Sequence, residues 1–249
     1  MKKICLFFPL LLFCISLSGQ TLKTYNGPYH GGQATYSYIE QEDGSRIYQG
    51  DFSWNQMIND RNITAKGKFV DGKRDGLWVF TVAQTKSKSL PANETLRVVY
   101  VNGRHSGEYS YKASANYTGQ GASSAFVRSN LVKAPEGMVL TATCKDNLFD
   151  GSLTITSKDG EKWEAQYNAS EQPYKIGIWK YIASNGTYFY DMATNSQYLI
   201  NKETGERQDR NSSGWSTYQT SIQARCLDLE AFCEPYPKTS GRYEPISEY

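Results

Sequence analysis

One short pattern recurs along this chain and restricts its fold more than any other feature. An alternating or apolar run leads into Asp-Gly or Asn-Gly, a second glycine follows, and then comes a run led by aromatic residues. The clearest copy spans residues 65–81, where Asp71-Gly72 precedes Gly76 and then Trp78 and Phe80. Asp-Gly and Asn-Gly favour the positive φ angles of tight hairpin turns, and apolar/polar alternation is typical of half-buried strands. The pattern therefore predicts a series of β-hairpins.

Five copies of the pattern can be recognised. They lie at 33–38 with 46–52 around Asp43-Gly44, at 65–81, at 96–111 around Asn102-Gly103, at 140–155 around Asp150-Gly151, and from Trp163 through Tyr167 to Asn185-Gly186. The second glycines of the later copies are 31, 44 and 26 residues apart. This uneven spacing predicts a solenoid-like stack of hairpins with insertions. The largest insertion, 113–138, is rich in Ser, Ala, Gly and Asn and is expected to be an exposed loop or an extra hairpin.

The same pattern assigns structural roles to individual residues. The residues expected in the repeat turns are Asp71, Gly72, Gly76, Asn102, Gly103, Gly107, Asp150, Gly151 and Gly177. Trp78, Tyr109 and Trp179 are expected to stack in the core of the repeats. Lys73 and Arg74 are expected in a solvated turn.

The start of the chain resembles a secretory signal peptide. Lys2 and Lys3 precede the uncharged apolar run Ile4–Ile15, and small residues follow up to Gly19. We expect cleavage near Gly19–Gln20, and hence a periplasmic, outer-surface or secreted protein. The run before Cys14 loosely resembles a lipoprotein signal, but Phe13 is a poor residue just before that type of cleavage point.

Composition excludes two classes of protein. Removing residues 1–19 leaves 25 basic and 25 acidic residues, which excludes a nucleic-acid binder that depends on bulk positive charge. A polytopic membrane protein is also excluded, because no later stretch approaches the roughly 20 apolar residues of a transmembrane helix. The chain has 19 Tyr and 10 Phe, which suits a sheet with one wet face, because Tyr can bury its ring while its hydroxyl stays hydrated.

The hairpin pattern resembles MORN-type repeats, in the bacterial variant found in secreted and YwqK-like proteins. The match is best at Gly67–Phe80 and fair at Val99–Tyr111, and it is weaker at 47–54, 140–155 and 163–181. This resemblance implies an elongated, curved antiparallel sheet of β-hairpins. It also implies a structural or interaction role rather than a particular ligand.

The character of the chain changes after about Arg210. An apolar stripe steps by three or four residues, and its members are Trp215, Tyr218, Ile222, Cys226, Leu229 and Cys233. This period predicts a C-terminal helix, which we expect to cover the open end of the sheet and to stop at Pro235. Glu234–Tyr249 is expected to be a loose tail. The predicted division is therefore a signal at 1–19, repeats at 20–209, and helix and tail at 210–249.

No group of residues has the spacing of a catalytic or metal site. His30 and His105 fall in separate predicted turns, and the sequence lacks the ligand spacings of zinc sites and the G-x-S-x-G elbow of serine hydrolases. Asp71, Asp75 and Asp150 are explained by turn chemistry. We therefore expect no enzyme activity, no metal and no cofactor.

Three cysteines remain after residue 19, and their pairing stays open. Cys226 and Cys233 would lie ~10 Å apart along a helix, beyond disulfide reach. Cys144, in an apolar run, is expected to be a small buried residue, and its pairing with either of the other two is an alternative.

Four tyrosines are the candidate binding residues. Tyr36, Tyr38, Tyr188 and Tyr190 alternate along predicted strands, so they either pack in the repeat core or form exposed rows of rings. The leading hypothesis is a non-enzymatic interaction or scaffold protein of a bacterial cell envelope that binds a protein partner. The alternative is a glycan-binding module that uses these rings, and a more remote one is a hydrolase with an unrecognised site.

Overall fold

The computed structural model describes residues 21–58, 61–84, 93–114, 139–156, 160–210, 238–239 and 242–243. These residues form strands and turns, with no helix among them. The strands are β1 Leu22–Tyr29, β2 Gly32–Glu40, β3 Arg46–Ile58, β4 Arg61–Val70, β5 Lys73–Gln84, β6 Asn93–Val101, β7 Arg104–Ser114, β8 Val139–Lys145, β9 Leu148–Phe149, β10 Gly151–Thr156, β11 Lys162–Tyr167, β12 Lys175–Ala183, β13 Gly186–Asp191, β14 Ser196–Asn201, β15 Arg207–Arg210, β16 Lys238–Thr239 and β17 Arg242–Tyr243.

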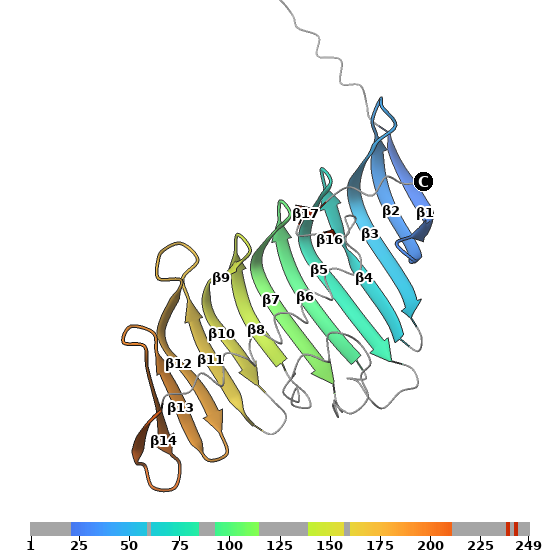
Figure 1. The fold of residues 1–249 in the computed structure, drawn as a ribbon. Helices are drawn as coiled ribbons and strands as arrows, with labels where there is room; N and C mark the ends of the chain where they lie inside the picture. Colours follow the sequence, from blue (N-terminus) through green and yellow to red (C-terminus); the bar gives the residue numbers. More distant parts are fainter. Residues whose placement is uncertain are drawn as a thin grey trace, which may run out of the picture.

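The first fifteen strands form one antiparallel sheet in which each strand pairs with its neighbours in the chain (Figure 1). The order runs from β1 to β15 without a crossover, and the short β9 pairs with β8 beside β10. The remaining strands, β16 and β17, pair with each other. The prediction of a mainly β fold in hairpin succession is confirmed. The signal at 1–19, the insertion beyond Ser114, and the helix predicted from Trp215 to Cys233 with its two cysteines lie outside the described residues.

Tight turns join four of the strand pairs, and both central residues of each have positive φ. The φ values are 46° and 74° at His30-Gly31, 49° and 74° at Asp71-Gly72, 51° and 81° at Asn102-Gly103, and 50° and 70° at Asp146-Asn147. Such angles match the right-handed twist of the flanking strands, which is why Asp, Asn and Gly occupy seven of these eight positions, with His30 at the eighth.

The second glycine of each repeat lies within a strand rather than in a turn. Gly50, Gly76, Gly107 and Gly177 have φ between 66° and 116°, and each lies where three residues of one strand oppose one residue of its partner. Gly151, with φ 79°, is the first residue of β10 and directly follows the break at Asp150 between β9 and β10. The expected turn role of Gly76, Gly107, Gly151 and Gly177 is therefore corrected to a β-bulge role, because a bulge also needs a residue that adopts positive φ at low cost.

The pattern also misplaced two turns and missed one strand. The turn of the fourth hairpin is Asp146-Asn147, and Asp150-Gly151 lies at the bulge that follows it. The fifth unit turns at residues 184–185, so Gly186 is the first residue of β13. β1 was assigned to no copy of the pattern, and its Asn26-Gly27 lies within the strand rather than in a turn, since β1 pairs with β2 over its whole length.

Hydrogen bonds between successive repeats join each turn to the bulge before it. The backbone N–H of Gly72 donates to the carbonyl of Tyr48, that of Gly103 to Arg74, and that of Asn147 to His105, at 2.9, 2.9 and 3.1 Å. Each acceptor is two residues before a bulge glycine. The bulge thus leaves a carbonyl outside the regular strand ladder, and the next turn satisfies it.

The two faces of the sheet differ in composition. One face, which we call the aromatic face, holds the core, because residues that are directly opposite on neighbouring strands share a face. A continuous row on it consists of Ala34, Trp54, Ala65, Phe80, Leu96, Tyr111, Leu140, Ile155, Trp163, Tyr181, Tyr188 and Leu199.

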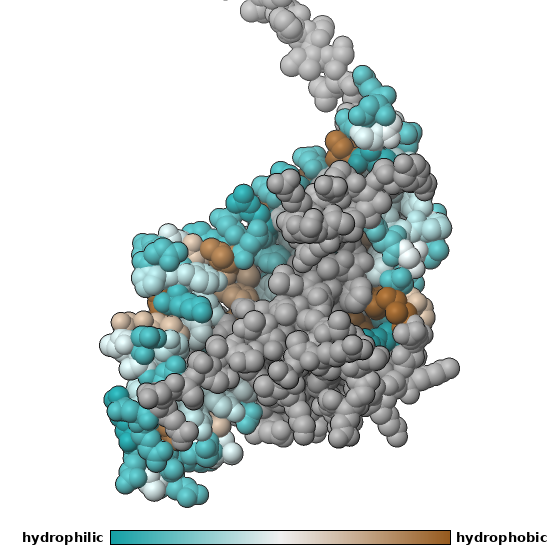
Figure 2. Space-filling model, in the orientation of Figure 1, coloured by the Kyte–Doolittle hydropathy of each residue, from teal (hydrophilic) through white to brown (hydrophobic). Residues whose placement is uncertain are grey.

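The opposite side, which we call the outer face, is mainly polar over most of its length. One row on it consists of Thr35, Ser53, Lys66, Val79, Arg97, Ser110, Thr141, Thr154, Glu164, Lys180, Phe189, Tyr198 and Asp209. The next row consists of Gln33, Asn55, Thr64, Thr81, Thr95, Lys112, Val139, Thr156, Lys162, Ile182, Thr187, Ile200 and Arg207. Figure 2 draws one side of the molecule in the orientation of Figure 1 and does not separate the two faces; hydrophilic residues cover most of its coloured surface, and hydrophobic residues are visible in a few separate places.

Candidate binding surface on the aromatic face

The residue two positions after each bulge glycine points onto the aromatic face. These residues are Phe52, Trp78, Tyr109, Leu153 and Trp179, and all of them are buried. The residues expected in the repeat core, Trp78, Tyr109 and Trp179, therefore occupy equivalent positions. In the first copy, Gly50 and Phe52 have the same glycine-x-aromatic spacing, although Gly50 was not among the second glycines named from the sequence.

Three buried indoles on this face donate hydrogen bonds to backbone carbonyls of other strands. The Nε1–H of Trp54 donates to the carbonyl of Tyr29 at 2.9 Å, that of Trp78 to Lys68 at 3.0 Å, and that of Trp179 to Gln166 at 3.2 Å. A buried indole without such a partner would cost free energy. These bonds fix the direction in which each ring lies.

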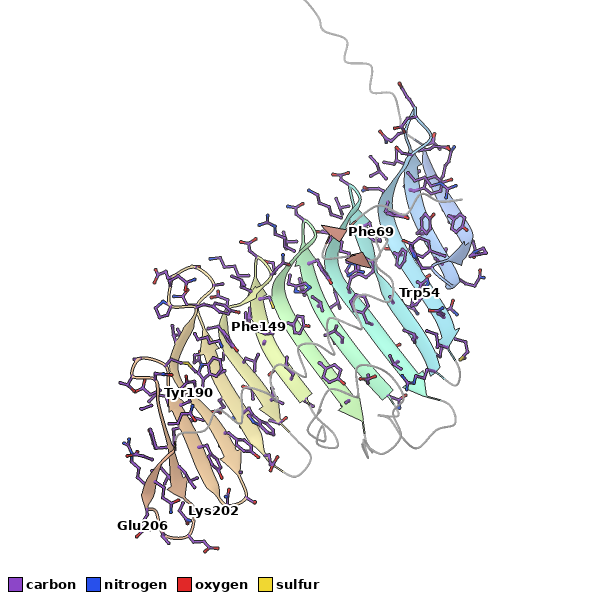
Figure 3. The ribbon with its side chains drawn as sticks, in the orientation of Figure 1. Trp54, Phe69, Phe149, Tyr190, Lys202 and Glu206 are labelled. Carbon is purple, nitrogen blue, oxygen red and sulfur yellow. The ribbon has the colours of Figure 1, made fainter. Side chains whose placement is uncertain are left out.

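Ring contacts link the repeats into a continuous ladder. Centroid distances of 4.8–6.3 Å connect Tyr25, Tyr36, Tyr48, Phe69, Trp78, Tyr100, His105, Tyr109, Phe149, Tyr167 and Trp179, in that order. Figure 3 labels Trp54, Phe69, Phe149 and Tyr190 along this face, from one end of the sheet toward the other. Edge-to-face and offset contacts of this kind add ~0.5–1.5 kcal/mol per pair beyond burial.

Two arginines are part of this aromatic cluster. The Arg74 guanidinium lies 4.7 Å from the Trp78 ring and donates to the Tyr100 hydroxyl at 3.1 Å. Arg46 lies 4.7 Å from the Tyr38 ring and donates to the Tyr36 hydroxyl at 3.2 Å. The expectation that Arg74 is solvated is wrong: it is buried in β5, since its position two residues before the bulge glycine faces the rings. Such contacts favour a guanidinium in an aromatic environment.

Tyr36 and Tyr38 were candidate binding residues with two alternatives, a place in the repeat core or an exposed row of rings, and the structure supports the core. The two rings share the aromatic face at a centroid distance of 5.9 Å, and the residues are only 1% and 8% exposed. A bulge opposite this pair turns Tyr48 and Phe52 onto the same side, so Tyr36 packs against both. Tyr36 and Tyr38 are therefore core residues.

Tyr188 and Tyr190 lie at the other end of the aromatic face and are half-buried. Tyr188 belongs to a parallel stack in which Tyr181 lies 4.6 Å from Trp163 and 5.6 Å from Tyr188, with interplanar angles of 12° and 22°. The Tyr190 hydroxyl donates to Asn195. Stacking on a sugar needs a ring with one open face. The Trp163 and Tyr188 rings cover both faces of Tyr181, so Tyr181 has no open face for a sugar.

Burial raises the pKa of Tyr181 to about 12, and the Glu161 carboxylate beside it adds to the rise. The folded state thus holds this proton more tightly than the unfolded chain, whose tyrosine titrates near its ordinary value of 10. The contribution to stability is complete below pH 10 and is lost as the pH rises toward 12.

We therefore expect the urea midpoint to fall between about pH 9 and pH 11 by less in Tyr181→Phe than in the parent protein. Absorbance at 295 nm across the same range would follow tyrosine ionisation directly. Equal pH dependence of the two proteins would show that the Tyr181 proton does not differ between folded and unfolded states.

The residues weighed for catalysis are dispersed. His30 lies in the first turn and His105 in β7, while Cys144 is buried in β8. The Asp75 carboxylate accepts the N–H of Asn102 at 3.4 Å, and that of Asp150 accepts the N–H of Ala169 at 3.0 Å. Within the described ranges, no three His, Cys, Asp or Glu side chains lie close enough together to hold a metal ion.

No model of a known protein family matches this chain, and no curated protein matches it at a significant level. In the part of the chain that the structure describes, there is no helix of the length and apolarity needed to span a membrane.

Proposed function

We propose that this protein is an exported, non-enzymatic interaction protein of a bacterial cell envelope, built from MORN-like hairpin repeats. It binds a protein partner that adds a strand to the edge of its sheet at β1. The observation that carries this proposal is that, among the described strands, the eight-residue β1 pairs with β2 alone. An edge strand presents backbone donors and acceptors to a partner segment, and strand addition is a common mode of peptide recognition.

The composition of β1 indicates which backbone groups point outward. Pro28 lacks an N–H, so it belongs at an outward-facing position of an edge strand. In agreement, its carbonyl accepts a hydrogen bond from the Tyr25 hydroxyl at 2.8 Å. Backbone N–H and C=O groups of successive residues point to opposite sides of the strand within the sheet, so the N–H groups of Leu22, Thr24 and Asn26 face outward like the position of Pro28. A partner strand would pair with this part of β1.

Site-specific photocrosslinking in cells that naturally express the protein tests this proposal. We expect a photoreactive phenylalanine analogue at Leu22 to give one adduct of defined mass, containing a single partner protein. The same analogue at Thr154, in the middle of the outer face, serves as the matched control and should give no adduct. Mass spectrometry of the Leu22 adduct would identify the partner and the segment attached.

A proline substitution separates strand addition from mere proximity. Thr24→Pro removes an outward N–H and leaves the inward ladder to β2 intact, so capture at Leu22 should be lost while the thermal transition is retained. Capture that survives Thr24→Pro, or that is equal at Leu22 and Thr154, would contradict edge pairing. Capture of polysaccharide instead of protein would favour the glycan-binding alternative.

A further inference from the structure

The outer face changes character at its C-terminal end. From β2 to β11 its two rows are polar except for Val79 and Val139. From β12 to β14, four of the six positions in these rows are apolar: Ile182, Phe189, Tyr198 and Ile200. We call these four residues, together with Ile178 on β12, the terminal patch.

The terminal patch is partly exposed, and its side chains contact one another. Ile178 is 45% exposed and Ile182 36% exposed, whereas the other three side chains are half-buried. The Phe189 and Tyr198 rings stack at 4.9 Å with an interplanar angle of 13°, and the Arg207 guanidinium lies 4.1 Å from the Tyr198 ring. Other exposed large apolar residues, such as Leu22 and Met57, lie far from this patch in the strand order.

These last strands are therefore apolar on both faces. On the aromatic face, β12 and β13 carry Trp179, Tyr181 and Tyr188 in the same stretch. Strands that are apolar on both sides are typical of sheets that are covered on both sides. In a sheet with one face in water, apolar and polar residues alternate along each strand. The terminal patch thus has the composition of a surface that another layer covers.

We propose that a second copy of this chain covers the terminal patch, with the two outer faces packed against each other about a two-fold axis. Charge favours this occupant. The charged residues around the patch are balanced. The two rows carry Lys162, Lys180 and Arg207 with Glu164 and Asp209, and Asp191 lies directly opposite Ile178 in the adjoining row. A surface of balanced charge is self-complementary in a two-fold dimer, whereas a strongly charged partner would gain nothing from it.

The size of the patch sets the strength of the dimer. Three strands at ~4.8 Å spacing and about six residues at ~3.3 Å give roughly 300 Å² per copy, or about 600 Å² in total. Stable complexes bury about 1,600 Å², so the dimer should be weak and depend on concentration. We expect half-association at tens to hundreds of micromolar.

Sedimentation velocity of the purified full chain, from about 5 to 500 µM, tests this proposal. The parent protein should shift from monomer to dimer, and Ile182→Lys should stay monomeric throughout, because it places a charge in the centre of the patch. Leu77→Lys is the matched control, since Leu77 is 41% exposed on the outer face of β5, and it should dimerise like the parent. The proposal would be overturned if the parent protein remained monomeric at every concentration. It would also be overturned if Ile182→Lys and Leu77→Lys reduced dimerisation equally.

Two further measurements keep the test independent of folding. Unfolding curves of the variants must match that of the parent, and Ile178→Ser replaces Ile182→Lys if the lysine variant is less stable. A photoreactive residue at Thr187, inside the patch, should yield an adduct of twice the chain mass at high concentration. Absence of that adduct under conditions where sedimentation shows a dimer would place the dimer interface elsewhere.

Discussion

Trp78→Ala should lower the free energy of unfolding by about 3–5 kcal/mol, the range for removing a large buried aromatic side chain. Trp78 is fully buried, and its ring lies 5.0 Å from Phe69, 5.5 Å from Phe52 and 5.9 Å from Phe80. The substitution also removes the indole donor and leaves the Lys68 carbonyl without that bond. Urea unfolding followed by circular dichroism measures the loss.

The neighbouring residue supplies the control. Leu77 is 41% exposed on the outer face, so Leu77→Ala should change the free energy of unfolding by roughly 0.5 kcal/mol or less. The two residues are adjacent in sequence and differ in the face that they occupy. Losses of similar size at both positions would mean that the aromatic face is not the core of the sheet.

Gly67→Ala should be among the most destabilising glycine substitutions in the described part of the chain, with a loss of about 3 kcal/mol, the upper end of the usual range for overpacking. A Cβ atom at Gly67 would lie 2.2 Å from Cδ2 and 2.3 Å from Cε2 of Trp78. The indole cannot move aside easily, because its Nε1–H is bonded to Lys68 and rings pack around it. The same unfolding measurement reports this loss.

Gly76→Ala separates steric overlap from backbone strain. Gly76 has φ 66° but no heavy atom within 4 Å of its Cβ position, so only the left-handed backbone costs about 1–2 kcal/mol.

Gly67, by contrast, does not need positive φ. In a Trp78→Ala background the cost of Gly67→Ala should largely disappear, because the overlapping ring is absent. Additive losses in the double variant would show that Gly67 is needed for another reason.

The proposed interactions lie at the two ends of the array of repeats. Bulge glycines, stacked turns and the ring ladder couple each hairpin to the next over most of the sheet. The β1 edge and the terminal patch lie at opposite ends of this array. Edge pairing and face-to-face dimerisation are therefore compatible within one molecule, and the variants that test them do not overlap.

Features that depend on a few neighbouring residues could be predicted well. The turns at Asp71-Gly72 and Asn102-Gly103 follow from positive φ, which few residue types adopt cheaply. The equivalent positions of Trp78, Tyr109 and Trp179 follow from their constant distance to a glycine. The local rule failed where two candidates competed, as at Asp146-Asn147 and Asp150-Gly151, because both dipeptides suit a positive φ and only strand pairing separates them.

The sequence by itself determined that this chain makes successive β-hairpins, and which residues of a strand share a face, since side chains alternate with a period of two. Only the tertiary structure decided whether the Tyr36 and Tyr38 rings are buried or exposed. Tyr36 and Tyr38 join the core because a bulge across the strand pair brings Tyr48 and Phe52 to their side. Ile182, Phe189, Tyr198 and Ile200 become one patch because three strands align them in register. Register and burial arise from contacts between residues far apart in sequence, which a local pattern does not specify.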